Sequence, residues 1–372
     1  MKKKKIETIG LIINIILTAL FTITIFSTFN NHINNLTAEE ELIMLVITVF
    51  SIYISMYLQL IIHELGHLIF GLITGYKFSS FRIGSFMIMK TTKKLKIKKL
   101  KVAGTTGQCL MSPPEIKNGK MPIVLYNLGG AILNVFSCII IYLISILITN
   151  PSVSTILELS MAYGLYFAAL NAIPMKSGTI DNDGYNTLSL IINKNSQQAF
   201  WTQLKINELQ AKGTRLKNMP EEWFYIPKPS DMKNSINASI AVFTCNRLLE
   251  QHKFKEANET MKKLLRSKTS ILGLHRNLLV CDRIFCELIL DEKQKANKLM
   301  TTELDNFMNT MKDFPSVIRT KYTYALLYEN NMEKAQELKK KFISREKNYP
   351  YPSEIRGEKE LINIVTSIHK EK

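Results

Sequence analysis

The residues best suited to chemistry are His63, Glu64 and His67, which form the pattern H-E-x-x-H. On a helix, His63 and His67 lie four residues apart on one face, so both imidazoles can bind one metal ion. Zinc favours neutral imidazole nitrogen, and a catalytic zinc site keeps one position open for water. Glu64 follows the first histidine and can accept a proton from that water. The pattern therefore predicts a hydrolytic zinc site.

The surroundings of this motif strengthen the interpretation. The pattern is short and also occurs by chance on surface helices, but here it lies in the later half of an apolar run over residues 42–76. A charged acid in the middle of a membrane helix costs about 2.5–3.5 kcal/mol. Pairing with a polar partner explains one ionisable group in such a run, whereas three within five residues favour a metal site.

Zinc of this type usually needs a third protein ligand. Pro174 predicts the end of an apolar helix, because proline lacks an N–H and clashes with the preceding turn. The chain beyond it can return toward the histidines, and it carries Asp181 and Asp183. Both qualify as ligands by chemistry. Gly184 permits an unusual backbone conformation and so favours its neighbour Asp183.

Together these motifs resemble the site-2 protease family of intramembrane metalloproteases. The resemblance rests on the H-E-x-x-H helix, on Asn171-x-x-Pro174 and on Asp183-Gly184, and it covers residues 42–193. It implies that zinc is bound by the two histidines and Asp183, and that Glu64 is the general base. The spacing from Pro174 to Asp183 is longer than in many members, which leaves Asp181 open as the alternative ligand.

Two asparagines are further candidates. The run from Gly129 to Asn134 is similar to a glycine-containing motif of that family, with Ala131 where proline is common. The resemblance implies that Asn134 and Asn171 bind the substrate. An alternative for Asn134 is packing between helices, because an amide in an apolar run needs a partner inside the protein.

Apolar runs over residues 6–29, 42–76, 121–149 and 154–175 predict four membrane spans, because a span needs about 20 residues. The run at 42–76 is well above this length, which suggests a tilted or long helix or one that ends in a cavity lined by protein. The chain has 372 residues and a formal net charge of +17. Its lysines gather at residues 2–5, in the loop at 77–120 and in the C-terminal half, which four spans place on one side of the membrane. Because cytoplasmic loops are enriched in Lys and Arg, we expect a multi-pass cell-membrane protein with both termini in the cytoplasm.

The basic loop shows a different periodicity. Between residues 81 and 102 apolar and polar residues alternate, which predicts strands in a small β-hairpin or sheet at the cytoplasmic membrane surface. The alternative is an irregular basic loop.

The C-terminal half predicts a soluble helical domain. Residues 234–251 with 254–266, and 319–330 with 332–345, form two similar helical hairpins that resemble tetratricopeptide-type repeats. The expected fold is mainly α, divided into a span and external loop (1–40), a membrane metalloprotease core (41–193), a linker (194–232) and a cytoplasmic helical domain (233–372). The five cysteines are scattered and predict reduced thiols.

These features lead to two hypotheses of different classes. The first is an intramembrane zinc metalloendopeptidase that cleaves membrane-embedded or membrane-proximal peptides. The second is a non-catalytic membrane scaffold with a structural metal and a helical domain that recruits a protein partner. A peptide-maturation or bacteriocin-related protease shares the chemistry of the first and differs only in substrate. Both hypotheses involve membrane lipid, and neither involves nucleic acid.

Overall fold

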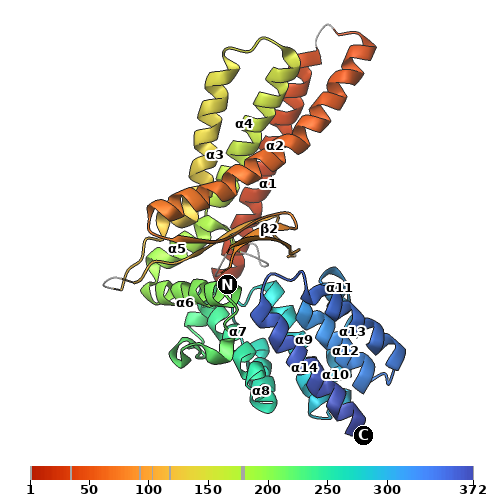
Figure 1. The fold of residues 1–372 in the computed structure, drawn as a ribbon. Coiled ribbons are helices and arrows are strands. Elements are labelled where there is room, and N and C mark those ends of the chain that lie inside the picture. The colour runs from red at the N-terminus through yellow and green to blue at the C-terminus, as the bar shows by residue number, and fades with distance from the viewer. Residues whose placement is uncertain are drawn as a thin grey trace. The chain divides into compact units, whose positions relative to one another are not determined.

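The chain divides into two units, which are built from interleaved parts of the sequence (Figure 1). A computed structural model describes residues 2–33, 36–91, 94–102, 104–116, 119–176 and 181–371. The first unit comprises Met1–Ile83 and Thr106–Asn193, and the second comprises Gly84–Thr105 and Lys194–Lys372. The fold is mainly helical, with a small antiparallel sheet of four strands.

The first unit is a bundle of four long helices and one short one: α1 (Lys2–Ile33), α2 (Ala38–Ile73), α3 (Val124–Ser145), α4 (Pro151–Ala172) and α5 (Asp183–Ile192). Local signals set where these helices begin. Thr37 and Glu40 form a capping box at the start of α2. Asn150 caps α4, and Pro151 takes the first helical position, where its missing N–H costs nothing.

Among the residues that the structure describes, four helices are long and apolar enough to cross a membrane: Thr8–Ile33, Ala38–Ile73, Val124–Ser145 and Pro151–Ala172. Their outward faces carry exposed large apolar side chains such as Phe50, Tyr57 and Phe136. Exposed apolar surface of this extent is the mark of helices that face lipid. The expected membrane protein with four candidate spans is therefore confirmed at this level.

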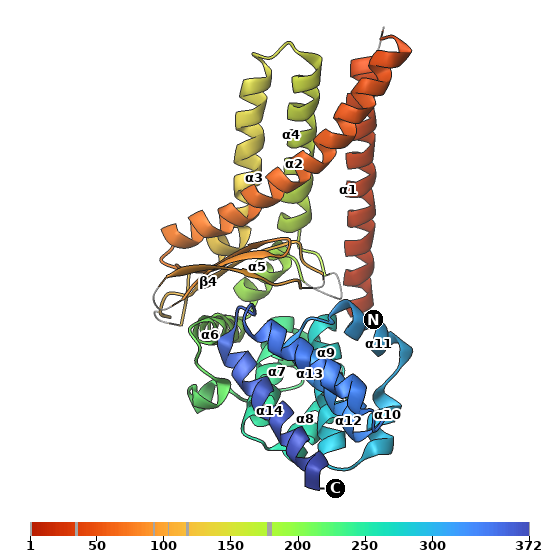
Figure 2. The same cartoon turned by 45° about the vertical axis from the view of Figure 1, so that its right-hand side comes forward.

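The inner face of α2 is polar, whereas the inner face of a helix in a soluble protein is usually apolar. Ser51, Ser55, Gln59, His63 and His67 follow one another at four-residue spacing, and all are buried. They share one stripe of the helix. The helix packs with this side against α3 and α4, and it runs obliquely to them (Figure 2). With 36 residues α2 is about 54 Å long, which exceeds the roughly 30 Å of a hydrocarbon core and fits a tilted span.

Close packing of α2 against α3 depends on glycine. A Cβ atom on Gly66 would lie 2.2 Å from the carbonyl oxygen of Gly129, and one on Gly129 would lie 2.6 Å from that of Gly66. The two backbones therefore touch where they cross, as in other membrane helix pairs with small residues at the contact. This crossing lies beside the two histidines.

Two strands complete the first unit. β1 (Lys77–Ile83) pairs antiparallel with β4 (Gly107–Ser112), and the register shifts between Phe78 and Ser80. β4 also packs against α2. The alternation that predicted strands is confirmed here, and β4 extends the strand region beyond residue 102.

The second unit contains a hairpin and a helical domain. β2 (Phe86–Lys90) pairs with β3 (Leu95–Lys99). The helices are α6 (Lys194–Ala211), α7 (Ser235–Glu250), α8 (Phe254–Arg266), α9 (Gly273–Ile289), α10 (Lys293–Leu299), α11 (Thr302–Thr310), α12 (Pro315–Leu327), α13 (Met332–Glu346) and α14 (Pro352–Glu371). Three short 3-10 turns, Leu216–Asn218, Glu221–Trp223 and Asp231–Lys233, join α6 to α7.

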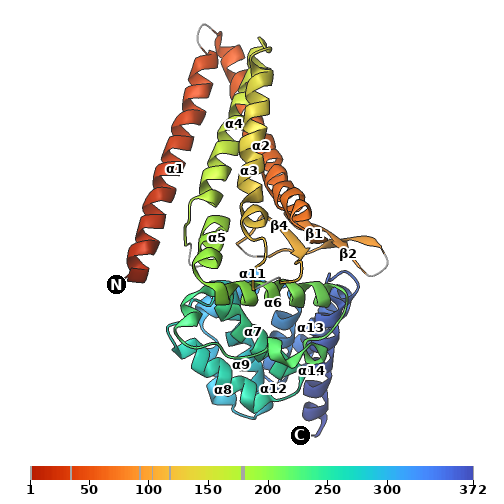
Figure 3. The ribbon, with the colours of Figure 1, turned by 90° about the vertical axis from the view of Figure 1, so that its left-hand side faces the viewer.

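Most helices of the second unit, drawn in Figure 3, contribute to one apolar core, whereas Ile206 of α6 belongs to a separate small cluster with Leu216 and Met219. α7 packs on α8 and α12 on α13, as expected for the two predicted hairpins. Ala257 and Ala335 are buried at equivalent places in them, whereas Met332 is 47% exposed and does not match the partly buried Phe254. The segment expected to be a linker instead contains α6, because Phe200, Leu204 and Ile206 supply a buried face.

The glycine contact between α2 and α3 can be tested by adding a methyl group. We expect Gly66→Ala to lower the free energy of unfolding by about 1–3 kcal/mol, because the new Cβ meets backbone that cannot move aside. Gly10→Ala is the matched control, since a Cβ there meets only ordinary contacts at 3.7 Å. Thermal unfolding in detergent measures both. Equal melting temperatures for the two variants would contradict the close crossing.

The second unit contains a carboxyl group whose ionisation opposes folding. Burial raises the pKa of Glu354 to about 7, and the charges of Glu358 and Glu250 raise this pKa further, although the Tyr349 hydroxyl donates a hydrogen bond to it. Between about pH 4.5 and 7 the unfolded chain loses this proton while the folded chain keeps it. We therefore expect stability to fall across that window, by up to about 3 kcal/mol.

Glu354→Gln removes the titration and preserves the size of the side chain. The variant should gain urea resistance relative to the wild type at pH 8 and show no such gain at pH 4. Urea titrations of the full chain in detergent, followed by far-ultraviolet circular dichroism, give both midpoints. A gain of equal size at both pH values would rule out the titration of Glu354 as its cause.

Candidate metal centre

Three ligand atoms from two distant parts of the chain meet in the first unit. Nε2 of His63 and Nε2 of His67 are 3.2 Å apart, and Oδ2 of Asp183 lies 3.2 Å from the former and 3.3 Å from the latter. His63 and His67 are 6% and 8% exposed, and the Asp183 side chain is 24% exposed. The site is therefore enclosed around the histidines and open at the aspartate.

The size of this triangle fits zinc. In a tetrahedral site with ligand bonds of about 2.0–2.1 Å, neighbouring ligand atoms are about 3.3–3.4 Å apart. The three observed separations are 3.2–3.3 Å. Among the residues that the structure describes, no fourth His, Cys, Asp or Glu joins this group. Three protein ligands without a fourth are the pattern of a catalytic rather than a structural zinc site.

Hydrogen bonds on the far side of each ring determine which nitrogen carries the proton. Nδ1 of His67 lies 2.8 Å from the main-chain oxygen of Tyr126, which can only accept, so Nδ1 donates. In the neutral ring this leaves Nε2 with a lone pair that faces the site. Such a partner on the other nitrogen is usual for histidines that bind metal.

His63 is held in the same way through Asn134. The amide nitrogen of Asn134 donates to the main-chain oxygen of Gln59 (2.9 Å) and to its Oε1 (2.8 Å). The amide oxygen of Asn134 therefore faces His63, whose Nδ1 donates to it over 2.9 Å. Two imidazole nitrogens and one carboxylate oxygen thus converge, and these three atoms could together hold a metal ion.

Asp183 reaches the histidines because α5 turns back against α3 and α4. Asn182 makes this turn: its Oδ1 accepts from the main-chain N–H groups of Met175 and Tyr185, and its Nδ2 donates to the carbonyls of Leu170 and Ile173. Asp183 follows as the first residue of α5, where the helix dipole favours a carboxylate.

Glycine is also needed at this turn. A Cβ atom on Gly184 would lie 2.2 Å from the main-chain oxygen of Ala172, so α5 touches the end of α4 there. A Cβ on Gly130 would lie 2.5–2.7 Å from the imidazole of His63. Glycine at these two positions thus allows both a ligand and the segment that carries another ligand to approach closely.

Glu64 is buried where α2 meets β4. It follows His63 on α2, is 6% exposed, and its carboxylate lies against Gly107 at the start of β4, where a Cβ would come within 2.3 Å of Oε1. The glycine on β4 leaves room for the carboxylate. Sequence reasoning did not identify Gly107.

The remaining candidates are placed as follows. Asp181 is buried outside the triangle, and the structure brings Asp183 to the histidines instead. Asn134 is completely buried and bonded to His63 and Gln59, which matches the helix-packing alternative. Asn171 donates to the carbonyl of Phe167 within α4. Substrate binding by Asn134 and Asn171 stays a prediction.

Besides Gly107, sequence reasoning missed three residues that build the site: Gln59, Tyr126 and Asn182. Gln59 had a detectable signal, since it is a polar residue one helical turn before His63 in an apolar span. Asn182 had one too, because asparagine before an acidic first turn is a typical helix cap. Tyr126 contributes a main-chain oxygen and had no signal.

No protein-family model matches this chain, and neither a curated protein nor a solved structure is significantly similar to it. Its function must therefore be inferred from the geometry of the site.

The two aspartates provide a matched test of the ligand set. We expect Asp183→Asn to weaken zinc binding by at least about tenfold, because a neutral amide replaces the carboxylate in the triangle. Asp181→Asn makes the same chemical change two residues away and should bind zinc as the wild type does. Zinc content after dialysis against a graded chelator measures both. Equal zinc retention by the two variants would exclude Asp183 as a ligand.

Proposed function

We propose that this chain is an intramembrane zinc metalloendopeptidase that resembles the site-2 protease family. The observation that carries the proposal is the buried triangle of His63, His67 and Asp183, with separations of 3.2–3.3 Å and with Glu64 beside His63. Zinc bound there would act as a Lewis acid and lower the pKa of a water molecule. The chain's own groups perform the remaining tasks.

Glu64 is the group that moves the proton. Its carboxylate accepts a proton from the attacking water and returns that proton to the leaving amine as the peptide bond breaks. Tyr126 and Asn134 keep both imidazoles in the tautomer that presents Nε2. The 24% exposure of the Asp183 side chain leaves the site accessible from that side.

A substrate helix must unwind before it is cut, because its backbone hydrogen bonds shield the carbonyls. β4 offers a place for the unwound segment, since it is the terminal strand of the sheet and begins at Gly107 beside Glu64. An extended peptide that adds to this edge would bring its backbone next to Glu64. The substrates are transmembrane helices, signal-peptide remnants or small secreted peptides.

We propose that both termini lie in the cytoplasm. An even number of crossings returns the chain to the side on which it started, and four helices qualify as spans. Lysines at residues 2–5 and the basic hairpin of β2 and β3 then share the side where positive residues are favoured. The repeat-like helical pairs α7–α8 and α12–α13 would recruit a cytoplasmic protein partner.

The scaffold hypothesis predicts a different number of protein ligands at the same site. A structural metal site is closed by four protein ligands, and no fourth ligand accompanies the triangle within the described part of the chain. A peptidase also needs a base that is dispensable for metal binding. Glu64 meets this requirement, because it is outside the ligand group.

Substituting Glu64 separates catalysis from metal binding. We expect Glu64→Gln to reduce cleavage by about 10²–10⁴-fold, because the amide cannot take up the proton, while zinc content stays at the wild-type level. Glu41→Gln, in the exposed first turn of the same helix, is the control. Mass spectrometry of membrane peptides from cells that produce each form measures the products. Undiminished products with Glu64→Gln would refute the assignment of the base.

A further inference from the structure

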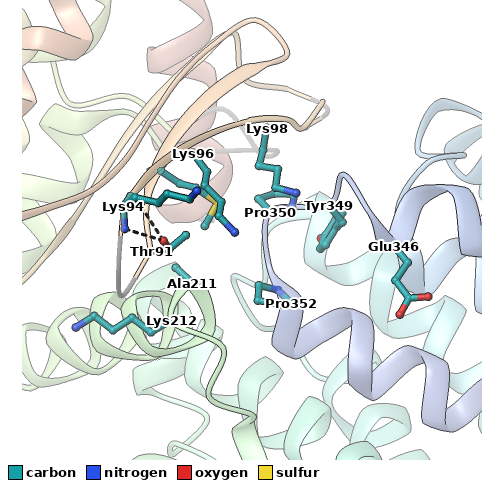
Figure 4. A pocket seen from close by; sticks show the side chains of 11 residues that line it. Thr91, Lys94, Lys96, Lys98, Ala211, Lys212, Glu346, Tyr349, Pro350 and Pro352 are labelled. Carbon is teal, nitrogen blue, oxygen red and sulfur yellow. Dashed lines mark hydrogen bonds between the residues drawn. The ribbon is translucent and has the colours of Figure 1, made fainter.

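A pocket lined by lysines lies in the second unit, and none of its lining residues belongs to the metal centre. Its volume is about 330 Å³, and its walls come from the β2–β3 hairpin, the end of α6 and the connection between α13 and α14. Figure 4 shows Lys96 and Lys98 on the hairpin with Pro350 and Tyr349 across from them. A pocket of this size accommodates a small ligand or a single headgroup.

The hairpin directs three lysines to this pocket by strand geometry. Lys96 and Lys98 are alternate residues of β3 and so share one face of the strand, and Lys94, just before the strand, lines the same pocket. On the same face, Lys96 pairs across from Met89 and Lys98 from Met87. Both methionines are 1% exposed in the apolar core of this unit, and they fix the hairpin against the helices.

The charge of these lysines is not balanced within the pocket. Glu346 is the acidic residue of the lining, and Lys359 donates to both of its carboxylate oxygens. The fourth lysine, Lys212, pairs with Glu208. In the described part of the chain, Lys94, Lys96 and Lys98 form no ion pair with an acidic side chain.

The pocket also restrains its cations. Lys98 donates from Nζ to the main-chain oxygen of Lys347 over 2.7 Å, which anchors β3 to the end of α13. Burial lowers the pKa of Lys98, and the neighbouring charge of Lys96 lowers it further. Cations crowded together without counter-charges favour an anion that can contact several of them.

We propose that this pocket binds a phosphate-bearing ligand through Lys94, Lys96 and Lys98. Lysine is a common phosphate partner because its ammonium group is a compact point charge with three donors. The ligand is either a soluble phosphorylated molecule or the headgroup of an anionic phospholipid. Both sources offer the same chemistry to the three ammonium groups, and occupancy would tie the hairpin to the helical domain.

A pair of double variants on one hairpin tests the site. Lys94→Gln with Lys96→Gln removes two charges from the pocket, and both positions are exposed, so the fold tolerates the change. Lys90→Gln with Lys99→Gln removes two charges from the opposite face of the same hairpin, where Lys90 pairs across from Leu95 and Lys99 from Phe86. Total charge is therefore equal in the two variants.

The probe is inorganic pyrophosphate, titrated calorimetrically into the full chain in phosphatidylcholine nanodiscs. We expect the wild type to bind it, the pocket variant to bind at least about tenfold more weakly, and the control variant to remain within about twofold of the wild type. Equal weakening in both variants would show only general attraction to positive charge and would overturn the proposal, as would the absence of binding to the wild type.

A second arm distinguishes the two sources of phosphate. In nanodiscs that contain phosphatidylglycerol, undiminished pyrophosphate binding identifies a site for a soluble ligand. Loss of pyrophosphate binding there, with binding retained in phosphatidylcholine, identifies a site that lipid headgroups occupy. The zinc content of the pocket variant should equal that of the wild type, so this test is independent of the metal centre.

Discussion

Two imidazole lone pairs and a carboxylate oxygen lie within 3.3 Å of one another in the bundle of α2, α3 and α5. A proton or a metal ion shared among these atoms would be strongly attracted to them, and the low polarity of the surroundings would strengthen the attraction. The need to hold these three side chains together explains why so much of the first unit is arranged around one point. Each of its special features either directs a ligand to that point or lets a helix approach it.

The supporting contacts are arranged so that the ligands have little freedom. His67 is oriented by the carbonyl of Tyr126, and His63 by Asn134, which is itself held by Gln59. Contacts of this kind fix the tautomer and orientation of a ligand before metal binds. In an apolar bundle they also satisfy polar groups that would otherwise be costly to bury, so stability and site geometry have the same origin.

The second unit is a charged helical chain packed around an apolar core. Both faces of its hairpin carry apolar side chains. Met87 and Met89 are buried in the core, whereas the other face exposes Phe86, Ile88, Leu95 and Ile97. Its lysines consequently fall on both faces. This distribution separates the lysines of the pocket from those of the outer face and makes a matched comparison of the two sets possible.

Much of this protein could be predicted from the sequence alone. Apolar runs of about 20 residues predict spans, because a bilayer requires that length, and alternation predicts strands, because side chains in a strand point to opposite faces. The pattern of His63, Glu64 and His67 is equally local, since helix geometry alone puts both rings on one face. Helical hairpins with short connections were predictable for the same reason.

Tertiary structure decided what depends on contacts between distant segments. Chemistry allowed both Asp181 and Asp183 as ligands, and only the turn held by Asn182 brings Asp183 to the histidines. The helical character of residues 194–211 became evident from the buried face that packs on α7. The division of the basic loop between two units likewise arises from packing. Local sequence encodes the period of an element, whereas the partner of each face is selected by shape and hydrogen bonding between segments that local periodicity does not relate.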